Sequence, residues 1–296
     1  MRGLQSPTRI QFKNILFAID FSPSAKLGVP YAAELARRYG ANLYAFHVRT
    51  PAVNPMTPPN SWRGLEEAAE IEIKQQRQEL LATFAGIQPE ILISEGDLWL
   101  NLKAAIEKHD IDLIVIGTRG RSGIPKFLWG SAAEEIFRQA PCPVMTVGPQ
   151  APAQLKEGEQ FAHILFATDF SSESDAAAPY ALSLAAQYRS HLTLLHVVVE
   201  MKVGDLVQPS EVMASDTRLL RNLIPPESEW CVPEYVVERG TASERILDVA
   251  AKRGANLIVL GVRRPSGFPV AATHLPVATA HKVVSEAHCP VLTVRG

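Results

Sequence analysis

The sequence contains one pattern twice, and this internal repeat constrains the fold more than any other feature. The letters ILFAIDFS at residues 15–22 return as ILFATDFS at residues 164–171. LIVIG at residues 113–117 likewise returns as LIVLG at residues 257–261, and each copy ends with a CPV run. Because the apolar segments recur in the same order, we expect one kind of domain to be present twice.

Length and composition agree with two compact domains. The 296 residues leave about 150 for each, and a hydrophobic content of 47% is enough to build a core in both. We assign the first domain to residues 1–149, a polar linker to 150–160 and the second domain to 161–296. The net charge of −2 and the lack of a long apolar run argue against nucleic-acid binding and against a membrane span. We therefore expect a cytoplasmic protein.

In each copy, short apolar runs alternate with stretches of helix-forming composition. The first copy has strand patterns at residues 15–19, 43–48, 91–94, 113–117 and 144–147, and helical patterns near 24–39, 65–84, 98–109 and 131–139. The second copy has strand patterns at 164–168, 192–197, 235–238, 257–261 and 291–294. This alternation predicts an α/β fold with two tandem five-stranded, mainly parallel sheets and helices on both faces.

The most specific motif follows the fourth predicted strand of the first copy. Gly117 and Gly120 come directly after that strand, whereas Gly130 and Ser131 open the next predicted helix, in the spacing G-x2-G-x9-G-S. A phosphate needs backbone N–H donors without a Cβ in the way, together with a helix N-terminus, and this spacing offers both. The motif is neither a Walker loop nor a dinucleotide fingerprint. Taken singly, each residue is also an ordinary turn or capping residue, which leaves a structural alternative open.

With these motifs, the chain resembles the universal stress protein family in its tandem two-domain form. The resemblance extends over nearly everything from Lys13 to Val294. It rests on the DFS letters after the first strand, on the His47-Val48 pair that ends the second, and on the glycine spacing. The complete glycine pattern is typical of the branch of that family that binds ATP.

The resemblance implies a nucleotide site in the first copy. Asp20 would offer its carboxylate to ribose hydroxyls or to the base edge; the alternative is that it only bonds backbone donors ahead of the next helix. Arg119 and Arg121 would neutralise phosphate charge, unless they are simply solvated. The adenosine part would lie against Ala18, Asp20, Val48 and Gly117, and the phosphates against Gly120, Gly130, Ser131 and Ala132.

The second copy departs from the motif where phosphate contacts are expected. Gly261 keeps the first glycine, but Arg264 stands at the second, and Val277 and Ala278 stand at the last two positions. Side chains at these positions would narrow the approach to the backbone. Asp169 and Val197 survive, which would leave an adenosine-sized pocket without a triphosphate cradle. We expect the second copy to be structural or regulatory.

Together these features predict an ATP-binding switch or sensor in the stress response, with Mg²⁺ carried by the phosphates and no dedicated metal site in the protein. No catalytic motif is evident, so we expect binding without efficient turnover. A slow ATPase or phosphotransferase on the same fold, and a nucleotide-free scaffold, are the open alternatives. The family also implies that the two copies pair through residues 144–147 and 291–294 as an internal pseudo-dimer, with homodimerisation of whole chains open as well.

Overall fold

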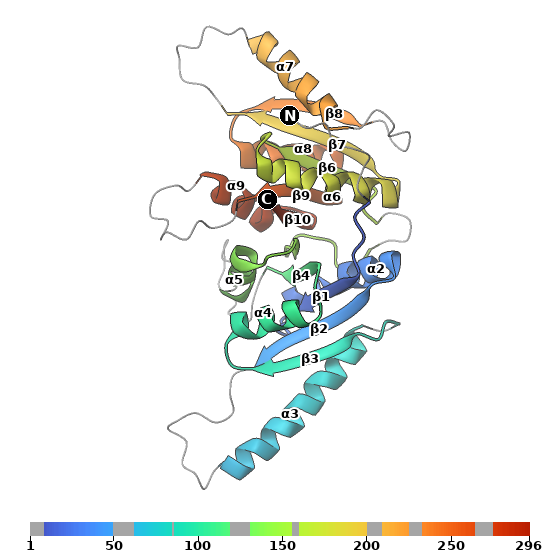
Figure 1. Cartoon of the computed structure of the whole chain (residues 1–296), viewed down its shortest axis with the longest axis vertical. Coiled ribbons are helices and arrows are strands. Elements are labelled where there is room, and N and C mark those ends of the chain that lie inside the picture. The colour runs from blue at the N-terminus through green and yellow to red at the C-terminus, as the bar shows by residue number, and fades with distance from the viewer. Residues whose placement is uncertain are drawn as a thin grey trace.

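The computed structural model describes residues 9–49, 62–84, 86–118, 131–155, 160–199, 209–224, 233–263 and 275–296. Within these ranges the two halves of the chain lie end to end along the long axis of the molecule (Figure 1). No helix formed by these residues is long and apolar enough to cross a membrane.

Both halves repeat the same series of elements. The first half contains β1 (Asn14–Ala18), α1 (Pro23–Lys26), α2 (Val29–Tyr39), β2 (Asn42–Arg49), α3 (Trp62–Thr83), β3 (Glu90–Glu95), α4 (Leu98–Lys108), β4 (Leu113–Gly117), α5 (Ser131–Gln139) and β5 (Val144–Val147). The second half contains β6 (His163–Thr168), α6 (Ser172–Tyr188), β7 (His191–Val198), α7 (Pro209–Asn222), β8 (Glu234–Arg239), α8 (Ala242–Arg253), β9 (Leu257–Val262), α9 (Leu275–Glu286) and β10 (Val291–Arg295).

The strands form one continuous ten-stranded sheet in the order β3-β2-β1-β4-β5-β10-β9-β6-β7-β8. All neighbouring pairs within a half are parallel. The chain winds outward from β1 in both directions, because β1 pairs with β2 on one side and with β4 on the other. Strand order therefore reverses between β1 and β4, and again between β6 and β9, which is where open α/β sheets bind ligands.

Helices cover both faces of the sheet, as the alternating pattern predicts. Phe17 packs into a core layer under α2, α3, α6 and α7, whereas its neighbour Leu16 packs into the opposite layer under α4, α5, α8 and α9. Both side chains are fully buried. A strand that is buried on both faces has a continuous apolar sequence. This is why the strands could be predicted from the sequence. The predicted α/β fold class is confirmed.

One predicted helix is wrong. The sequence suggested a single helix near residues 24–39, but the structure divides this segment into α1 and α2. Gly28 lies at the division, where a Cβ would stand 2.7 Å from the ring of Phe17, and Pro30 follows without an N–H to donate. In the second half, Ala177 takes the place of Gly28, and α6 continues unbroken through Pro179.

The two halves join through backbone pairing between β5 and β10, the antiparallel contact in the sheet. Met145 lies opposite Leu292, and both are fully buried. The Thr146 hydroxyl donates to the carbonyl of Val291 (3.1 Å), and the Thr293 hydroxyl donates to the carbonyl of Val144 (3.1 Å). The apolar terminal strand of each half is thus covered by the other rather than left as an open edge.

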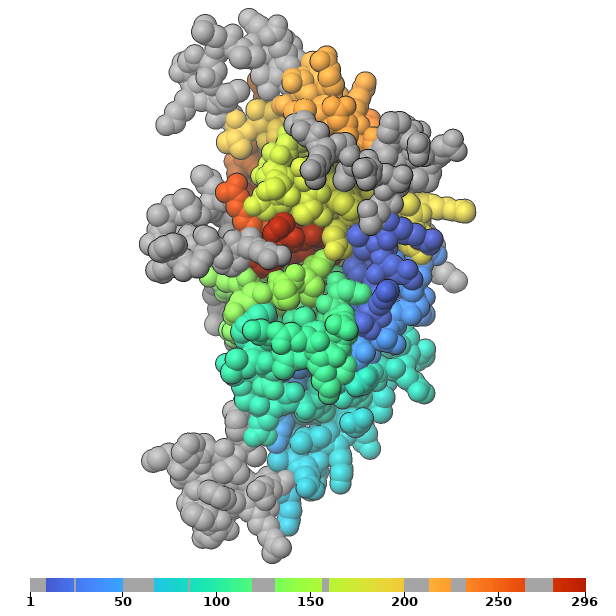
Figure 2. All heavy atoms as spheres, viewed as in Figure 1, coloured from blue at the N-terminus to red at the C-terminus, as the bar shows by residue number. Residues whose placement is uncertain are grey.

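The two halves also meet beyond the sheet, where the blue start of the described chain lies against the yellow part of the second half (Figure 2). The guanidinium of Arg38 lies 4.9 Å from the ring centroid of Tyr188 on α6, and Phe12 packs between Tyr39 and Tyr180, at 5.0 and 6.2 Å between centroids. Aromatic and cation–π contacts of this kind each add a modest stabilisation. The two halves therefore share one core layer.

Truncating Leu292 to alanine tests the β5–β10 junction. We expect the Leu292→Ala variant to lose about 3 kcal/mol of unfolding free energy, because a buried leucine leaves a cavity when it is shortened. The measurement is chemical denaturation followed by circular dichroism. Leu100→Ala is the matched control, since this side chain is 68% exposed and its loss should change stability by less than about 0.5 kcal/mol. Equal losses in the two variants would contradict this role of the junction.

Candidate nucleotide pocket

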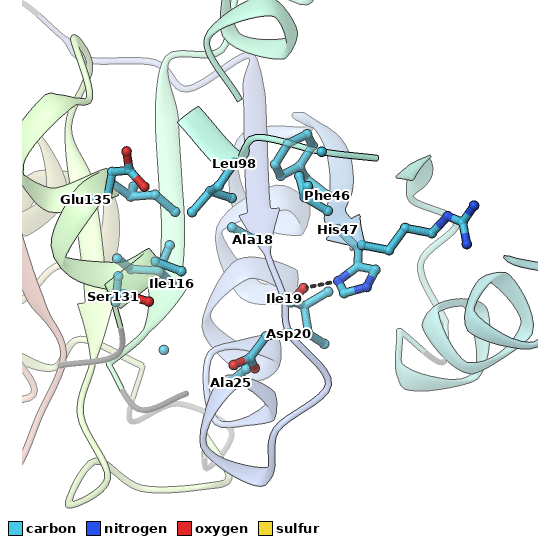
Figure 3. Close-up of a pocket in the computed structure, with 17 residues that line it drawn as sticks. Ala18, Ile19, Asp20, Ala25, Phe46, His47, Leu98, Ile116, Ser131 and Glu135 are labelled. Atoms are coloured by element: carbon cyan, nitrogen blue, oxygen red, sulfur yellow. Dashed lines mark hydrogen bonds between the residues drawn. The ribbon is translucent and has the colours of Figure 1, made fainter. Parts of the chain in front are cut away.

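A pocket of about 320 Å³ opens at the reversal point between β1 and β4. Its walls come from the carboxyl ends of β1, β2 and β4, the start of α4 and the first turns of α5. In Figure 3, Asp20 extends from the end of β1, and Ser131 and Glu135 extend from α5. This is the position at which parallel α/β sheets hold their ligands.

The pocket brings together six of the residues that the sequence assigned to the site. The other four predicted residues, Arg119, Gly120, Arg121 and Gly130, lie outside the described residues. The six that line the cavity are Ala18, Asp20, Val48, Gly117, Ser131 and Ala132.

A sharp turn after β1 holds Asp20 at the cavity. Phe21 adopts a φ of 59°, in the left-handed region, and this reverses the chain directly after Asp20. The Asp20 carboxylate accepts a hydrogen bond from the Ser22 N–H (3.0 Å), and the Ser22 hydroxyl oxygen accepts one from the Ala25 N–H (3.1 Å). Asp20 thus makes the backbone bond that the structural alternative expected, and it also lines the cavity.

The end of β2 forms a second wall. Val48 is half-buried and lines the cavity, and it also packs against the core. His47 beside it is buried, and its Nδ1 lies 2.8 Å from the carbonyl oxygen of Ile19. A carbonyl only accepts, so Nδ1 carries the proton in this contact. This bond ties the end of β2 to the residue before Asp20.

Helix α5 directs its N-terminus toward the cavity. Ser131 is its first residue, and Ser131 and Ala132 both line the pocket. The first N–H groups of a helix have no partner within it and, together with the helix dipole, attract anions. The nine-residue helix is anchored by Ile136 and Phe137, which are both buried. The arrangement offers backbone donors and a hydroxyl to an anionic group.

Sequence reasoning missed several lining residues. Glu135 follows Ser131 by four positions and so shares its helix face, and Phe46 precedes Val48 by two and so shares its strand face. These two residues could have been predicted from their spacing once the bounds of α5 and β2 were known. Gly96 lies between β3 and α4, and Leu98 is the first residue of α4; only the tertiary fold brings these two residues to the cavity.

Comparison with known proteins agrees with this fold. A model of the universal stress protein family matches residues 11–148 and again residues 160–295. The chain belongs to the universal stress protein family. Because the model matches twice along one chain, this universal stress protein is of the tandem form.

Individual relatives match one domain at a time. A universal stress protein of Thermus aquaticus is 31% identical over 136 residues, which cover 46% of this chain and 98% of the relative. Universal stress protein A homolog 1 of Coxiella burnetii is 34% identical over 143 residues, covering 47% and 97%. The crystal structure of a universal stress protein from Archaeoglobus fulgidus is similar over the full length, with a TM-score of 0.69 at 21% identity, covering 97% of this chain and 99% of that one.

The second domain of this universal stress protein uses the equivalent carboxylate internally. Asp169 accepts hydrogen bonds from the Ser171 N–H (3.0 Å) and from the hydroxyls of Ser171 and Ser174, the latter at 2.7 Å. Partial burial raises the pKa of Asp169, but these hydrogen bonds outweigh it and leave the pKa below its usual value. The first domain has Ala25 where Ser174 stands, so only the second domain engages its carboxylate in this way.

Helix α6 also packs directly onto the carboxyl end of β9. A Cβ on Gly261 would stand 2.4 Å from the backbone carbonyl of Glu173 and 2.5 Å from the nitrogen of Ser174. Arg263 reinforces the contact, with its Nε 3.6 Å from the Glu173 carboxylate. At the reversal point of the second domain, the backbone of α6 therefore lies directly against the backbone of β9.

This close approach predicts that Gly261→Ala is poorly tolerated. The added methyl meets main chain rather than a movable side chain, so we expect a loss of about 1–3 kcal/mol in unfolding free energy, measured by chemical denaturation. Gly148→Ala is the control, because a Cβ there would meet its nearest atoms at 3.5 Å, an ordinary contact. A Gly261→Ala protein as stable as Gly148→Ala would show that α6 does not press on β9 in solution.

Proposed function

We propose that this universal stress protein is an ATP-binding switch or sensor in the stress response, with one nucleotide bound by its first domain. The observation that carries the proposal is the pocket at the β1–β4 reversal point, which gathers Asp20, Val48, Gly117 and Ser131 from four separate elements. A site assembled in this way agrees with the assignment that the glycine motif and the family resemblance suggested.

The parts of a nucleotide would be divided among the walls. Asp20 would receive ribose hydroxyls, Val48 would flank the adenine ring, and Gly117 would let the nucleotide approach the end of β4. The phosphates would lie at the N-terminus of α5, on Ser131 and Ala132, and on Gly120 and Gly130 of the glycine motif, with Arg119 and Arg121 supplying positive charge.

The charge of the pocket favours a nucleotide that carries a divalent cation. Two carboxylates, Asp20 and Glu135, line the described part of the cavity and would repel bare phosphates. Mg²⁺ bound to the phosphate oxygens would reduce that repulsion, and it needs few protein ligands of its own. We therefore propose Mg-ATP as the bound form.

Asp20 provides a direct test of binding. We expect Asp20→Asn to weaken ATP affinity about tenfold or more, because a charged acceptor for ribose hydroxyls is lost while the amide oxygen still accepts from Ser22. The measurement is isothermal titration calorimetry with Mg-ATP on the full chain. Asp169→Asn, the same change at the equivalent place in the second domain, should leave ATP affinity unchanged.

A second variant addresses the glycine motif. Gly130→Val, which introduces the residue found at the equivalent position of the second copy, should abolish ATP binding with the fold intact by circular dichroism. Unchanged affinity in both Asp20→Asn and Gly130→Val would place the ligand elsewhere. No ATP binding by the unmodified chain would favour the nucleotide-free scaffold.

We further expect little turnover. Fast phosphoryl transfer needs a charge clamp at the γ-phosphate together with a positioned base or water. Arg49, the arginine that lines the described part of the pocket, pairs with Glu95 and lies 3.9 Å from Glu72. Phosphate release under saturating Mg-ATP should stay well below about 1 s⁻¹, a low enzymatic value. Sustained release above that rate would instead favour the ATPase or phosphotransferase interpretation.

The pairing of β5 with β10 supports a further part of the proposal. The two copies would act as an internal dimer, in which the second domain supports the nucleotide-binding first domain in the cytoplasm. Helix α5 connects the two functions, because its first turn lines the pocket and its Phe137 carbonyl accepts a hydrogen bond from Arg295 of β10. The proposed nucleotide site and the domain interface would thus lie at opposite ends of the same short helix, α5.

A further inference from the structure

A second cavity, of about 230 Å³, lies in the second domain at the amino ends of β9 and β10. It is on the opposite edge of the sheet from the strand ends that form nucleotide pockets. Helix α8 supplies Leu247 and Ala250, and the turn after it supplies Ala255. Strand β9 supplies Ile258, and the connection from α9 to β10 supplies Cys289. These walls are almost entirely apolar.

The same backbone motif ends α8 and its counterpart α4. The Ala255 N–H donates to the Ala250 carbonyl (2.8 Å), and the Ile111 N–H donates to the Ile106 carbonyl (3.1 Å). The residues before Ala255 and Ile111 both have positive φ, 62° and 49°. In helix ends of this type, the hydrogen bond joins two residues that are five positions apart. The side chains of these two residues usually make a hydrophobic contact.

The two domains have different side chains at the two positions joined by this hydrogen bond. In the first domain, Ile106 and Ile111 are 7% and 5% exposed and belong to the core. In the second domain both positions are alanine, so the side chains that close the first domain are missing. Protein interiors are close-packed, and an unfilled apolar cavity lowers stability in proportion to its volume. A molecule that fills this space would recover part of that loss.

The chemistry of the walls defines the ligand. Burial raises the pKa of the Cys289 thiol to about 12, so it stays uncharged and acts as a soft, polarisable contact. His288 lies exposed at the rim and is the other ionisable group among the lining residues. A charge placed against the apolar walls would lack a partner there, which disfavours ionic ligands. An apolar cavity of roughly 150 Å³ already takes up benzene, so this larger one has room for a two-ring molecule.

We propose that the second domain binds a neutral apolar molecule of benzene to indole size in the cavity between α8 and the amino ends of β9 and β10. This site is separate from the nucleotide pocket and does not depend on it. The second domain would thereby respond to a different class of ligand from the first.

The experiment uses indole as the probe on the full-length protein. We expect isothermal titration calorimetry to show one indole per chain, and saturating indole to raise the thermal unfolding midpoint by about 3 °C. Ala250→Ile restores the side chain found in the first domain, and it should weaken indole binding at least tenfold. Ala255→Ile is a second filling variant that serves if the first one misfolds. Ala104→Ile, an exposed position on α4, is the matched control and should bind indole normally.

Three results would overturn the proposal. One is the absence of indole binding to the unmodified protein. Another is unchanged indole affinity when both Ala250 and Ala255 have been enlarged, since the probe must then bind elsewhere. The third is displacement of indole by saturating Mg-ATP, which would place the probe in the pocket of the first domain. Binding that persists with ATP and disappears in the filling variants would support the site.

Discussion

The rest of the structure depends on the pairing of β5 with β10. Each of these short strands is buried along almost its whole length, and each would end its own five-stranded sheet with unpaired N–H and C=O groups. Antiparallel pairing satisfies both edges at once and turns two sheets into one. The paired threonines Thr146 and Thr293 bond across the junction in a reciprocal way, as expected for two copies related by a local two-fold axis.

Once the copies are joined, each can change without losing the fold, and they have diverged at both ends of the sheet. At the carboxyl ends of the strands, the first domain keeps an open pocket, while the second lets α6 approach Gly261 and engages Asp169 with Ser171 and Ser174. At the amino ends the difference is reversed, because the first domain is filled by two isoleucines and the second has a cavity. The two domains thus offer different surfaces on one scaffold.

The nucleotide pocket illustrates how a parallel sheet concentrates chemistry. Asp20, Val48 and Gly117 are far apart in sequence, but each follows or ends a strand, and the carboxyl ends of parallel strands share one edge. The sequence could predict this grouping because it depends on strand direction alone. It could not predict Leu98 or Gly96, which reach the cavity through the β3–α4 connection, nor Arg49, whose partners Glu72 and Glu95 come from α3 and β3.

Residue patterns alone were enough to predict the repeat, the α/β class, the strands and the residues that end them. Periodic apolar runs indicate which strand residues are buried. The spacing of glycines indicates where the backbone approaches a ligand or another segment closely. The tertiary structure was needed to show that Gly28 breaks a helix against Phe17, that α6 packs onto Gly261 at the second reversal point, and that Ala250 and Ala255 line a cavity. These outcomes depend on distances between elements remote in the chain, where a single methyl group decides between contact, clash and empty space.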